Sequence, residues 1–445
     1  MLSPSPLGIV LSLQRFHGES FSSILEYSID NTNSGKMSKR LTIIADDLTG
    51  AMDSSGYLAG LGLSVVVFLD KYIRTTAAVS VISTDSRKDT PSVAAEKIKR
   101  MAKGLRGQIV FKKVDSTLRG NIDTELTALM EILSYEKAVL APAFPAVGRT
   151  VVNGVLLVRG KPVAETNFAR DLVTPVRESS IPLLLKSTGC TVGTVTLETV
   201  AKGAWALSRE YTSRSERILV CDTAEQSHLK TIAAASSLAG SRMLLAGSGG
   251  LARELHLLID GSAAKKSLKP EANKPGPTLI VIGSRHPVTA RQIKKAEKES
   301  QLPFLQLRIE ELDNASRKPS ERNSIVKSAL HHLEKGQSVA ITSSFSRLMS
   351  AFEQEIVDEL AEIAVLILDA GKTKGLFLSG GDTATAVCRA LEASKIRVYG
   401  EIIPGMPAGE LFAGRKRLRL VTKAGAFGDE TAIVESMPFL ERGEL

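Results

Sequence analysis

The sequence predicts an α/β protein of two domains, each a mainly parallel sheet flanked by helices. Its 445 residues exceed what one hydrophobic core holds, since single cores stop growing at roughly 250 to 300 residues. The apolar runs, such as the one that begins at Leu41 and those at Leu63–Leu69 and Val79–Ser83, are nearly continuous, as in strands covered on both faces. Successive runs end in polar or glycine-rich turns, where open α/β sheets bind their ligands.

Each element of the first half follows from the alternation of such runs with helical patterns. Thr49 is the expected cap of the first helix, and Pro91 falls in the first turn of a later one, where no N–H is needed. Asn153-Gly154 predicts the turn of a β-hairpin. The other expected strands are Gln108–Phe111, Ala138–Ala141, Ile218–Cys221 and Met243–Ala246, and the expected helices are Thr49–Gly60, Pro91–Lys103 and Ile122–Leu133.

The second half repeats this rhythm after a stretch rich in Lys, Pro, Ala and Gly. Its expected strands are Thr278–Ile282, Phe304–Leu307, Val339–Thr342, Gly375–Leu378, Val398–Ile403 and Leu418–Val421, with a helix from Pro287. We expect residues 1–36 to be a disordered N-terminal extension, because Met37 precedes the first strand as an initiator would. The remaining parts are a first domain at 37–259, a linker at 260–277 and a second domain at 278–445.

Composition narrows the classes of function. A net charge of +9 and a pI near 9.3 suit a protein that handles anions, either small phosphates and carboxylates or nucleic acid. Aromatic residues make up 4% of the chain, too few for a base-stacking surface. The three cysteines form no CxxC pair and no HExxH occurs, so we expect no metal site and a cytoplasmic location. No apolar run reaches the ~18 residues of a membrane span.

Two polar turns of the first half carry groups suited to chemistry. Asp46-Asp47 offers two carboxylates at a strand end, which can accept a hydroxyl proton or bind hydroxyls; a helix cap beside a solvated carboxylate is the alternative. The stretch Lys112–Asn121 combines cations, an aspartate and hydroxyls that suit an acidic polyol; a solvated turn is the alternative. Arg87, in the TDSR motif, is a weaker candidate when taken alone, because it could simply form an ion pair on the surface.

Glycine-bearing turns of the second half form the clearest phosphate-binding pattern. In SGGDTATA at 379–386, glycines let backbone N–H groups approach an oxyanion, and the helix from about Thr383 points its positive end there. Gly283 and Gly425–Gly428 follow two further strands. Neither GxxxxGK[ST] nor an early GxGxxG occurs, which excludes P-loop and dinucleotide folds. The basic run Gly414–Arg419 is better explained as a solvated face than as a nucleic-acid contact.

Together these motifs resemble the four-carbon acid sugar kinase family, which includes kinases of threonate, erythronate and 3-oxo-tetronate. The motifs that carry the resemblance are IADDLTGA at 44–51, TDSR at 84–87, KVDSTLRGN at 113–121, APAFPAVGRT at 141–150, GS at 283–284, SGGDTA at 379–384, PGMPAG at 404–409 and KAGAFG at 423–428. They span Lys39 to Leu445 in the family's order. The departures are the extension at 1–36, Ala426 where glycine is common, and the bulky pair Arg285-His286.

The resemblance implies a two-domain kinase that uses ATP with Mg²⁺, with the sugar acid on the first domain and the nucleotide on the second. The implied substrate contacts are Asp47, Arg87, Lys113, Val114, Asp115 and Ser116, to which we add Asp46 and Arg149. The implied nucleotide contacts are Ser284, Gly380, Gly381, Asp382, Thr383 and Gly425, to which we add Gly428. Mg²⁺ is expected to arrive with the nucleotide, near Asp382, rather than at a metal site of the protein.

We expect the γ-phosphoryl group of ATP to pass to the terminal (C4) hydroxyl of a four-carbon sugar acid, in carbohydrate catabolism. Asp47 or Asp115 would be the base, and Arg87 and Lys113 would hold the substrate carboxylate. Domain closure around the linker would join the two sites. The expected partner is a small sugar acid, and we expect binding to neither nucleic acid nor a membrane. A homodimer is possible. Alternatives are a sensor that binds sugar acid or nucleotide without turnover, and a nucleic-acid-binding protein.

Overall fold

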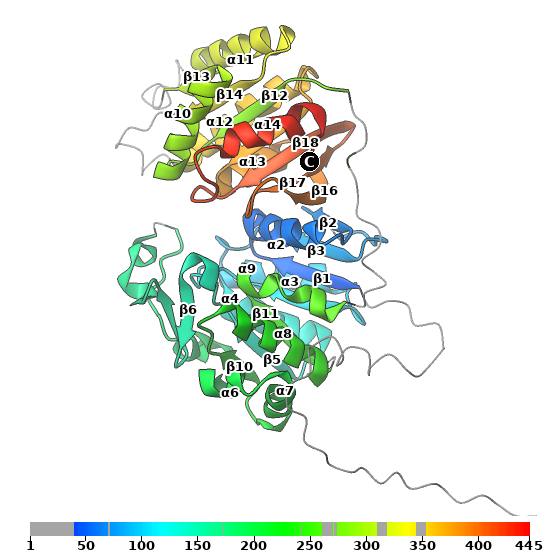
Figure 1. The fold of residues 1–445 in the computed structure, drawn as a ribbon, viewed down its shortest axis with the longest axis vertical. Coiled ribbons are helices and arrows are strands. Elements are labelled where there is room, and N and C mark those ends of the chain that lie inside the picture. The colour runs from blue at the N-terminus through cyan, green and yellow to red at the C-terminus, as the bar shows by residue number, and fades with distance from the viewer. Residues whose placement is uncertain are drawn as a thin grey trace, which may run out of the picture. The chain divides into compact units, whose positions relative to one another are not determined.

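A mixed, mostly parallel sheet of 15 strands runs through the described part of the chain (Figure 1). Its first-half strands are β1 (Leu41–Ala45), β2 (Val65–Phe68), β3 (Val79–Ser83), β4 (Ile109–Lys113), β5 (Lys137–Ala141), β9 (Val192–Val195), β10 (Ile218–Cys221) and β11 (Met243–Gly247). Its second-half strands are β12 (Thr278–Ile282), β13 (Phe304–Leu307), β14 (Val339–Ser343), β15 (Gly375–Ser379), β16 (Ala393–Glu401), β17 (Pro407–Ala413) and β18 (Lys416–Lys423). The spatial order is β13-β14-β12-β15-β18-β17-β16-β2-β3-β1-β4-β11-β5-β10-β9.

The computed structural model describes residues 40–445 apart from 70–71, 172, 241, 260–269, 271–273, 309–317 and 344–352. Lys39 to Leu445 form one compact unit. The extension expected at 1–36 and most of the linker expected at 260–277 lie outside the described residues.

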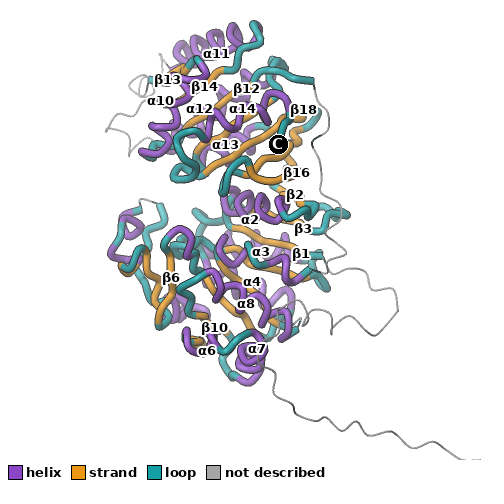
Figure 2. Tube along the Cα trace, viewed as in Figure 1, coloured by secondary structure: helices purple, strands orange, loops and turns teal. Residues whose placement is uncertain are grey.

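Helices alternate with the strands along the chain (Figure 2). In the first half they are α2 (Leu48–Gly60), α3 (Pro91–Ala102), α4 (Ile122–Leu133), α5 (Ile181–Leu184), α6 (Leu197–Ala201), α7 (Ala204–Ser213), α8 (Gln226–Ala239) and α9 (Gly249–Ala252). In the second half they are α10 (Pro287–Ser300), α11 (Lys318–Glu334), α12 (Glu353–Asp369), α13 (Gly381–Ala390) and α14 (Ala432–Arg442). Within the described ranges, no helix is both long enough and apolar enough to cross a membrane.

Alternate side chains of the strands pack into different cores, which explains the continuous apolar runs. In β1, Ile43 joins a core with α2, α7 and α8, whereas Ile44 joins a core with α3 and α4. In β12, Val281 joins a core with α11, α12 and α13, whereas Ile282 joins a core with α10 and α14. Since successive strand residues point to opposite faces, a strand covered by helices on both faces must be apolar throughout.

A second, three-stranded sheet follows β5. It consists of β6 (Arg149–Val152), β7 (Val155–Val158) and β8 (Lys161–Pro162), and its first turn is Asn153-Gly154, with φ of 52° and 72°. Two positive φ angles are what a two-residue hairpin turn requires, so the predicted hairpin is confirmed. Short 3₁₀ turns surround this sheet: η1 (Pro145–Val147), η2 (Val163–Glu165), η3 (Asn167–Arg170), η4 (Leu185–Thr188) and, before the linker, η5 (Leu255–Leu258).

Several predicted elements are confirmed to the residue, and others need correction. The cap of α2 is Asp47, whose carboxylate accepts the N–H of Gly50 at 2.9 Å, and Thr49 already lies inside the helix. β4 extends through Lys113 and takes both lysines into the strand. β16 begins and ends earlier than the predicted Val398–Ile403. β9 and β17 were not predicted, because glycine and proline interrupt their apolar patterns.

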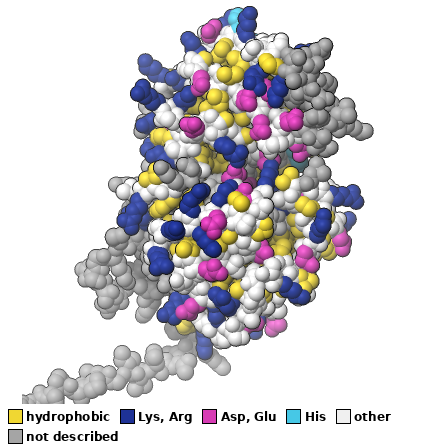
Figure 3. Space-filling view, turned by 180° about the vertical axis from the view of Figure 1, so that it is seen from behind, with side chains coloured by type: hydrophobic (Ala, Val, Ile, Leu, Met, Phe, Trp, Pro, Cys, Tyr) yellow, Lys and Arg dark blue, Asp and Glu magenta, His cyan; other side chains and the backbone are white. Residues whose placement is uncertain are grey.

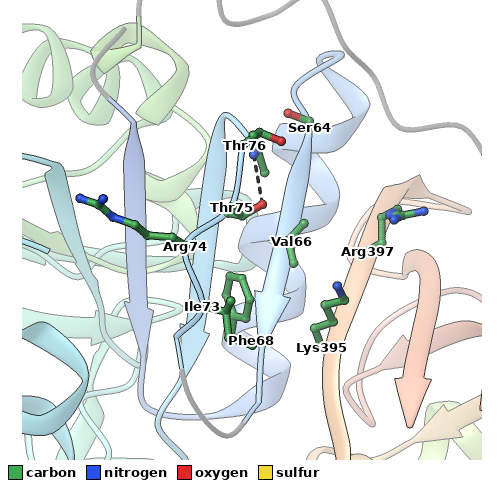
Figure 4. Close-up of a pocket in the computed structure, with 10 residues that line it drawn as sticks. Ser64, Val66, Phe68, Ile73, Arg74, Thr75, Thr76, Lys395 and Arg397 are labelled. Atoms are coloured by element: carbon green, nitrogen blue, oxygen red, sulfur yellow. Dashed lines mark hydrogen bonds between the residues drawn. The ribbon is translucent and has the colours of Figure 1, made fainter. Parts of the chain in front are cut away.

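The expectation of a separate sheet in each half is also wrong, because one sheet includes both. β2 pairs antiparallel with β16, in a register that opposes Val65 to Val398 and Phe68 to Lys395. β2 would otherwise be an edge strand, apolar on both faces and with unpaired backbone groups. A hollow of about 240 Å³ flanks this pairing, with Val66, Phe68, Lys395 and Arg397 along it (Figure 4). No residue predicted for the functional site lines it.

Candidate functional site

Three strands of the first half end side by side and bring the predicted polar turns together. β1 lies between β3 and β4, with Ala45 opposite both Ser83 and Lys113. The residues after each strand, from Asp46, from Thr84 and from Val114, therefore meet at one sheet edge. The predicted convergence of the DDLTG, TDSR and KVDST motifs is present in the structure.

Arg87 is the centre of this cluster. Its Nε and Nη2 donate to Asp46 at 2.8 and 2.9 Å, and its Nη1 and Nη2 donate to Asp47 at 2.7 and 2.8 Å. Its Nη1 also lies 3.7 Å from Asp115 Oδ1. A guanidinium shared among three carboxylates has little capacity left for a ligand, so Arg87 arranges the acidic groups around it.

The three carboxylates differ in their affinity for protons. Burial alone would raise the pKa of Asp46, but the charges of Arg87 and Lys112 outweigh it and lower that pKa. Burial also opposes ionisation of Asp115, yet Arg119 and Arg87 hold its pKa well below the ordinary value. Burial raises the pKa of Asp47 despite Arg87, and the neighbouring Asp46 charge adds to the increase. Asp115 is therefore a poor proton acceptor.

The two lysines of β4 have different environments, because neighbouring strand residues point to opposite faces. Lys112 is fully buried and pairs with Glu125 of α4 at 2.7 Å, and Ser86 donates to the same carboxylate. Lys113 Nζ donates to the carbonyl of Val114 at 3.0 Å. Lys113 therefore points to the face of the sheet that α2 covers, beside the polar turns. Lys112 points to the opposite face, where it forms a buried ion pair with Glu125.

Arg149 is a cation with no carboxylate partner among the described residues. Its Nη1 donates to Ser116 Oγ at 2.7 Å, its Nε is buried without a hydrogen-bond partner, and its guanidinium carbon lies 5.7 Å from the centre of the Phe168 ring. Arg119 lies at the same distance from that ring but is bound to Asp115. Phe168 was not predicted, because one aromatic residue in a long polar segment gives no sequence signal.

The glycine turns of the second half also converge. A Cβ added at Gly425 would lie 2.4 Å from Ser284 Oγ and 3.2 Å from His286 Cβ, so the glycine lets these two turns approach closely. Gly380 has a φ of 111°, and a Cβ there would lie 3.3 Å from the Ser284 N. Thr383 and Gly381 open α13 directly after this contact. Gly428 lies further along the same turn, against Met406 and Gln292.

Lys423, the last residue of β18, lies beneath these turns and was not predicted. Its Nζ donates to Thr289 Oγ1 and Ser379 Oγ, both at 3.3 Å, and to the Gly425 carbonyl at 3.2 Å. All three acceptors are neutral, and burial lowers the pKa of this amine to about 8. The only sequence signal for Lys423 was its place at the start of KAGAFG.

The two clusters lie against each other. A Cβ added at Gly381 would lie 2.7 Å from Thr49 Oγ1, which places the first turn of α2 on the start of α13. Lys88 Nζ and Asp382 Oδ1 form an ion pair at 2.6 Å, and Arg389 of α13 pairs with Asp85. The TDSR turn and the SGGDT turn are thus in direct contact.

Two further features concern metal ligands and the basic run of the second half. Among the described residues, no group of three His, Cys, Asp or Glu side chains could hold a metal ion. The basic run at 414–419 forms the β17–β18 hairpin, where Arg419 is buried and donates to the carbonyls of Leu440 and Glu441. Lys and Arg side chains are spread over the face seen in Figure 3, with acidic side chains between them.

Known proteins resemble this chain over nearly the whole described region. Residues 41–255 match a family model described as a sugar-binding N-terminal domain, and residues 279–433 match one described as a nucleotide-binding C-terminal domain. A D-erythronate kinase of Heliobacterium modesticaldum is 32% identical, covering 90% of this chain and 97% of that protein. A D-threonate kinase of Salmonella typhimurium is 31% identical (90% and 98%), and a 3-oxo-tetronate kinase of Brucella melitensis is 29% identical (91% and 97%).

Solved structures share the fold. A crystal structure of a protein from Salmonella typhimurium LT2 superimposes with a TM-score of 0.76, and one from Haemophilus influenzae with 0.69. Each is 23% identical and covers 90% of this chain, with 99% and 100% of their own chains matched. The family models and the full-length relatives together show that this chain belongs to the four-carbon acid sugar kinase family and is a phosphotransferase that acts on an alcohol group.

Proposed function

We propose that this protein transfers the γ-phosphoryl group of ATP to the C4 hydroxyl of a four-carbon sugar acid. The observation that carries the proposal is the contact between the acidic and basic turns of the first half and the glycine turns of the second, with Thr49 against Gly381. Phosphoryl transfer needs the positioning of two substrates and the neutralisation of charge more than it needs a protein nucleophile. Turns that bear cations and turns that bear glycines, in contact with each other, can position two substrates and neutralise the charge between them.

For the sugar acid, we assign its carboxylate to Arg149 and Lys113. Arg87 was expected in this role, but Asp46 and Asp47 already engage it. Arg149 has a buried Nε without a partner and only the Ser116 hydroxyl on its Nη1, so its guanidinium can bind a carboxylate through two nitrogens. Asp47, Asp115, Ser116 and the Val114 carbonyl then remain near the substrate hydroxyls.

For ATP, we assign the phosphates to the turns at Ser284, Gly380 and Gly425, above the Lys423 amine. The N–H groups of Ser284 and Gly380 donate to the carbonyls of Ser379 and Lys423, so the phosphate would be bound by the N–H groups that open α13, from Gly381 to Thr383. Asp382 is exposed and, within the described part of the chain, pairs with Lys88 alone, so its carboxylate could hold a Mg²⁺ ion delivered by the nucleotide. Mg²⁺ would neutralise the phosphates during transfer.

The relatives support the substrate class rather than one member of it. Proteins named as kinases of D-erythronate, D-threonate and 3-oxo-tetronate match this chain at 32%, 31% and 29% identity, so similarity does not separate them. We also propose that residues 37–259 bind the sugar acid, that residues 278–445 bind the nucleotide, and that 260–277 link them.

The test is ADP release by the full chain in the presence of ATP, Mg²⁺ and one of D- and L-threonate, D- and L-erythronate or their 3-oxo analogues. We expect acid-dependent ADP release with one or two of them, and phosphorus NMR should show coupling of the product phosphate to two C4 protons. Binding of an acid and ATP in calorimetry with no ADP release would instead identify a sensor. Coupling to a single proton would refute the C4 position.

A further inference from the structure

Asp53 is a carboxylate on the site-facing side of α2, and no sequence motif singled it out. It lies one turn after Gly50, on the same face of the helix. A Cβ added at Gly50 would lie 3.0 Å from Lys113 Nζ, so this face looks toward the lysine that we assign to the substrate. Lys113, Gly50 and Asp53 therefore border one space.

Segments of the first half supply most of the surroundings of Asp53, and Glu401 of β16 also lies near it, since burial and the Asp53 charge raise the pKa of Glu401. A Cβ added at Gly249 of α9 would lie 2.5 Å from Asp53 Oδ2 and 3.0 Å from the Phe144 ring. Phe144 belongs to the APAFPAVGRT motif. The Arg253 guanidinium lies over the rings of Phe144 and Tyr57, at 5.4 and 5.2 Å from their centres. These rings hold the arginine near Asp53 without an ion pair.

Asp53 differs from the other acidic groups of the site in having no partner. Asp46 and Asp47 are bound by Arg87, and Asp115 accepts hydrogen bonds from Arg119 and Thr117. Asp53 is half-buried and makes no hydrogen bond or ion pair with any described residue. Burial raises its pKa, and the charges of Lys113 and Arg253 counter this only in part. A partly desolvated, unpaired carboxylate accepts a proton more readily than one saturated by cations.

We propose that Asp53 is the general base of this kinase, in place of Asp47 or Asp115; the assignment rests on the proposed function. In the transfer step the C4 O–H bond breaks and its proton passes to an Asp53 carboxylate oxygen. The freed electron pair on C4 oxygen forms the new O–P bond. The bond from the γ-phosphorus to the β,γ-bridging oxygen breaks, and its electron pair stays on ADP.

The test compares Asp53→Asn with Asp47→Asn and with Asp358→Asn, a mid-helix control on exposed α12 surface. Loss of a general base lowers kcat by roughly 10² to 10⁴, so Asp53→Asn should fall by this amount while its KM for the sugar acid changes only a few-fold. Asp358→Asn should match the wild type. Asp47→Asn should mainly raise the KM for the acid, because it disturbs the Arg87 cluster. Thermal melting of each variant shows whether it is folded.

A second variant separates chemistry from structure. Asp53→Ala leaves room for a small carboxylate, so added formate should restore a measurable part of kcat, which a merely structural role would not permit. Wild-type turnover together with near-normal kcat in Asp53→Asn would overturn the assignment and leave the kinase function standing. A folded Asp53→Ala variant that formate fails to rescue would overturn the assignment as well. A wild type inactive with every four-carbon acid would overturn both proposals.

Discussion

Three arginines of the first half, Arg87, Arg119 and Arg149, differ in what their guanidinium groups touch. Arg87 spans two carboxylates, Arg119 is bound to Asp115, and Arg149 contacts, among the residues that the structure describes, only a hydroxyl and an aromatic ring. The same residue type therefore arranges acidic groups in two places, and in the third we propose that it receives a ligand. Only the partners of each arginine, not its position in a motif, reveal this difference.

Replacement of Arg149 by glutamine should raise the KM for the sugar acid by roughly 10- to 100-fold, since hydrogen bonds to charged groups contribute about 1.5 to 3 kcal/mol. The value of kcat should change much less, because the carboxylate does not react. Steady-state kinetics with varied acid measures both. The exposed Arg177 of the same half provides the control variant Arg177→Gln, which should leave KM unchanged. An unchanged KM in Arg149→Gln would remove Arg149 from the binding site.

The Lys423 amine should make ATP binding depend on pH. Burial lowers its pKa to about 8, so raising the pH above 8 discharges the amine in the free protein. If Lys423⁺ contacts phosphate, the Kd for ATP should rise roughly tenfold between pH 7.5 and 9, in proportion to the lost protonated fraction. The nearby His286 has a lowered pKa and is neutral throughout this range.

Calorimetric titration at several pH values measures this dependence. Lys423→Met should bind ATP weakly and with a flat pH profile. Lys416→Met, which removes a lysine at the other end of β18, should keep the wild-type profile. A wild-type Kd that stays constant from pH 7.5 to 9 would show that the amine does not contact the nucleotide.

At the scale of elements, the proposed nucleotide site depends on how closely three turns approach. Gly425→Ala should displace the Ser284 hydroxyl and press on the Ser284–His286 turn, because the new methyl would lie 2.4 Å from Ser284 Oγ and 3.2 Å from His286 Cβ. A misplacement of about 1 Å can cost roughly 10²-fold in activity, so we expect a large fall in kcat/KM for ATP with an unchanged KM for the acid. Gly60→Ala, which meets no atom within 4 Å, is the control. Equal kinetics in both variants would contradict the assignment.

Local sequence patterns predicted the position of most helices and strands. They failed where the structure depends on contacts between residues far apart in the sequence. Ile122–Leu133 and Thr278–Ile282 were bounded correctly because their apolar periodicity and flanking turns are local. The pairing of β2 with β16 joins segments more than 300 residues apart, and no local pattern reports it. The same limit applies to the site. The turns were predicted, but the surroundings of Asp53, Lys423 and Phe168 consist of residues that only the fold brings close.

At the scale of the whole molecule, the continuous sheet should make the two halves unfold together. Four residue pairs of β2 and β16 join them, and Gly56 of α2 packs on Glu401 and Pro407 of the second half. We expect one calorimetric transition for the full chain, and ATP at 100 times its Kd should stabilise that transition by about 2.7 kcal/mol. Two transitions, with only one shifted by ATP, would show that the halves unfold independently.

The β2–β16 pairing also determines what happens to a chain cut within residues 260–269. The first fragment would carry Val65–Phe68 as an open edge that is apolar on both faces, and such edges recruit foreign strands. Fragments produced apart should therefore aggregate, whereas fragments produced together should reassociate by strand addition. A nucleotide-dependent enzyme that reassembles in this way is a starting point for a two-fragment reporter, whose activity would register the proximity of whatever proteins the fragments are fused to.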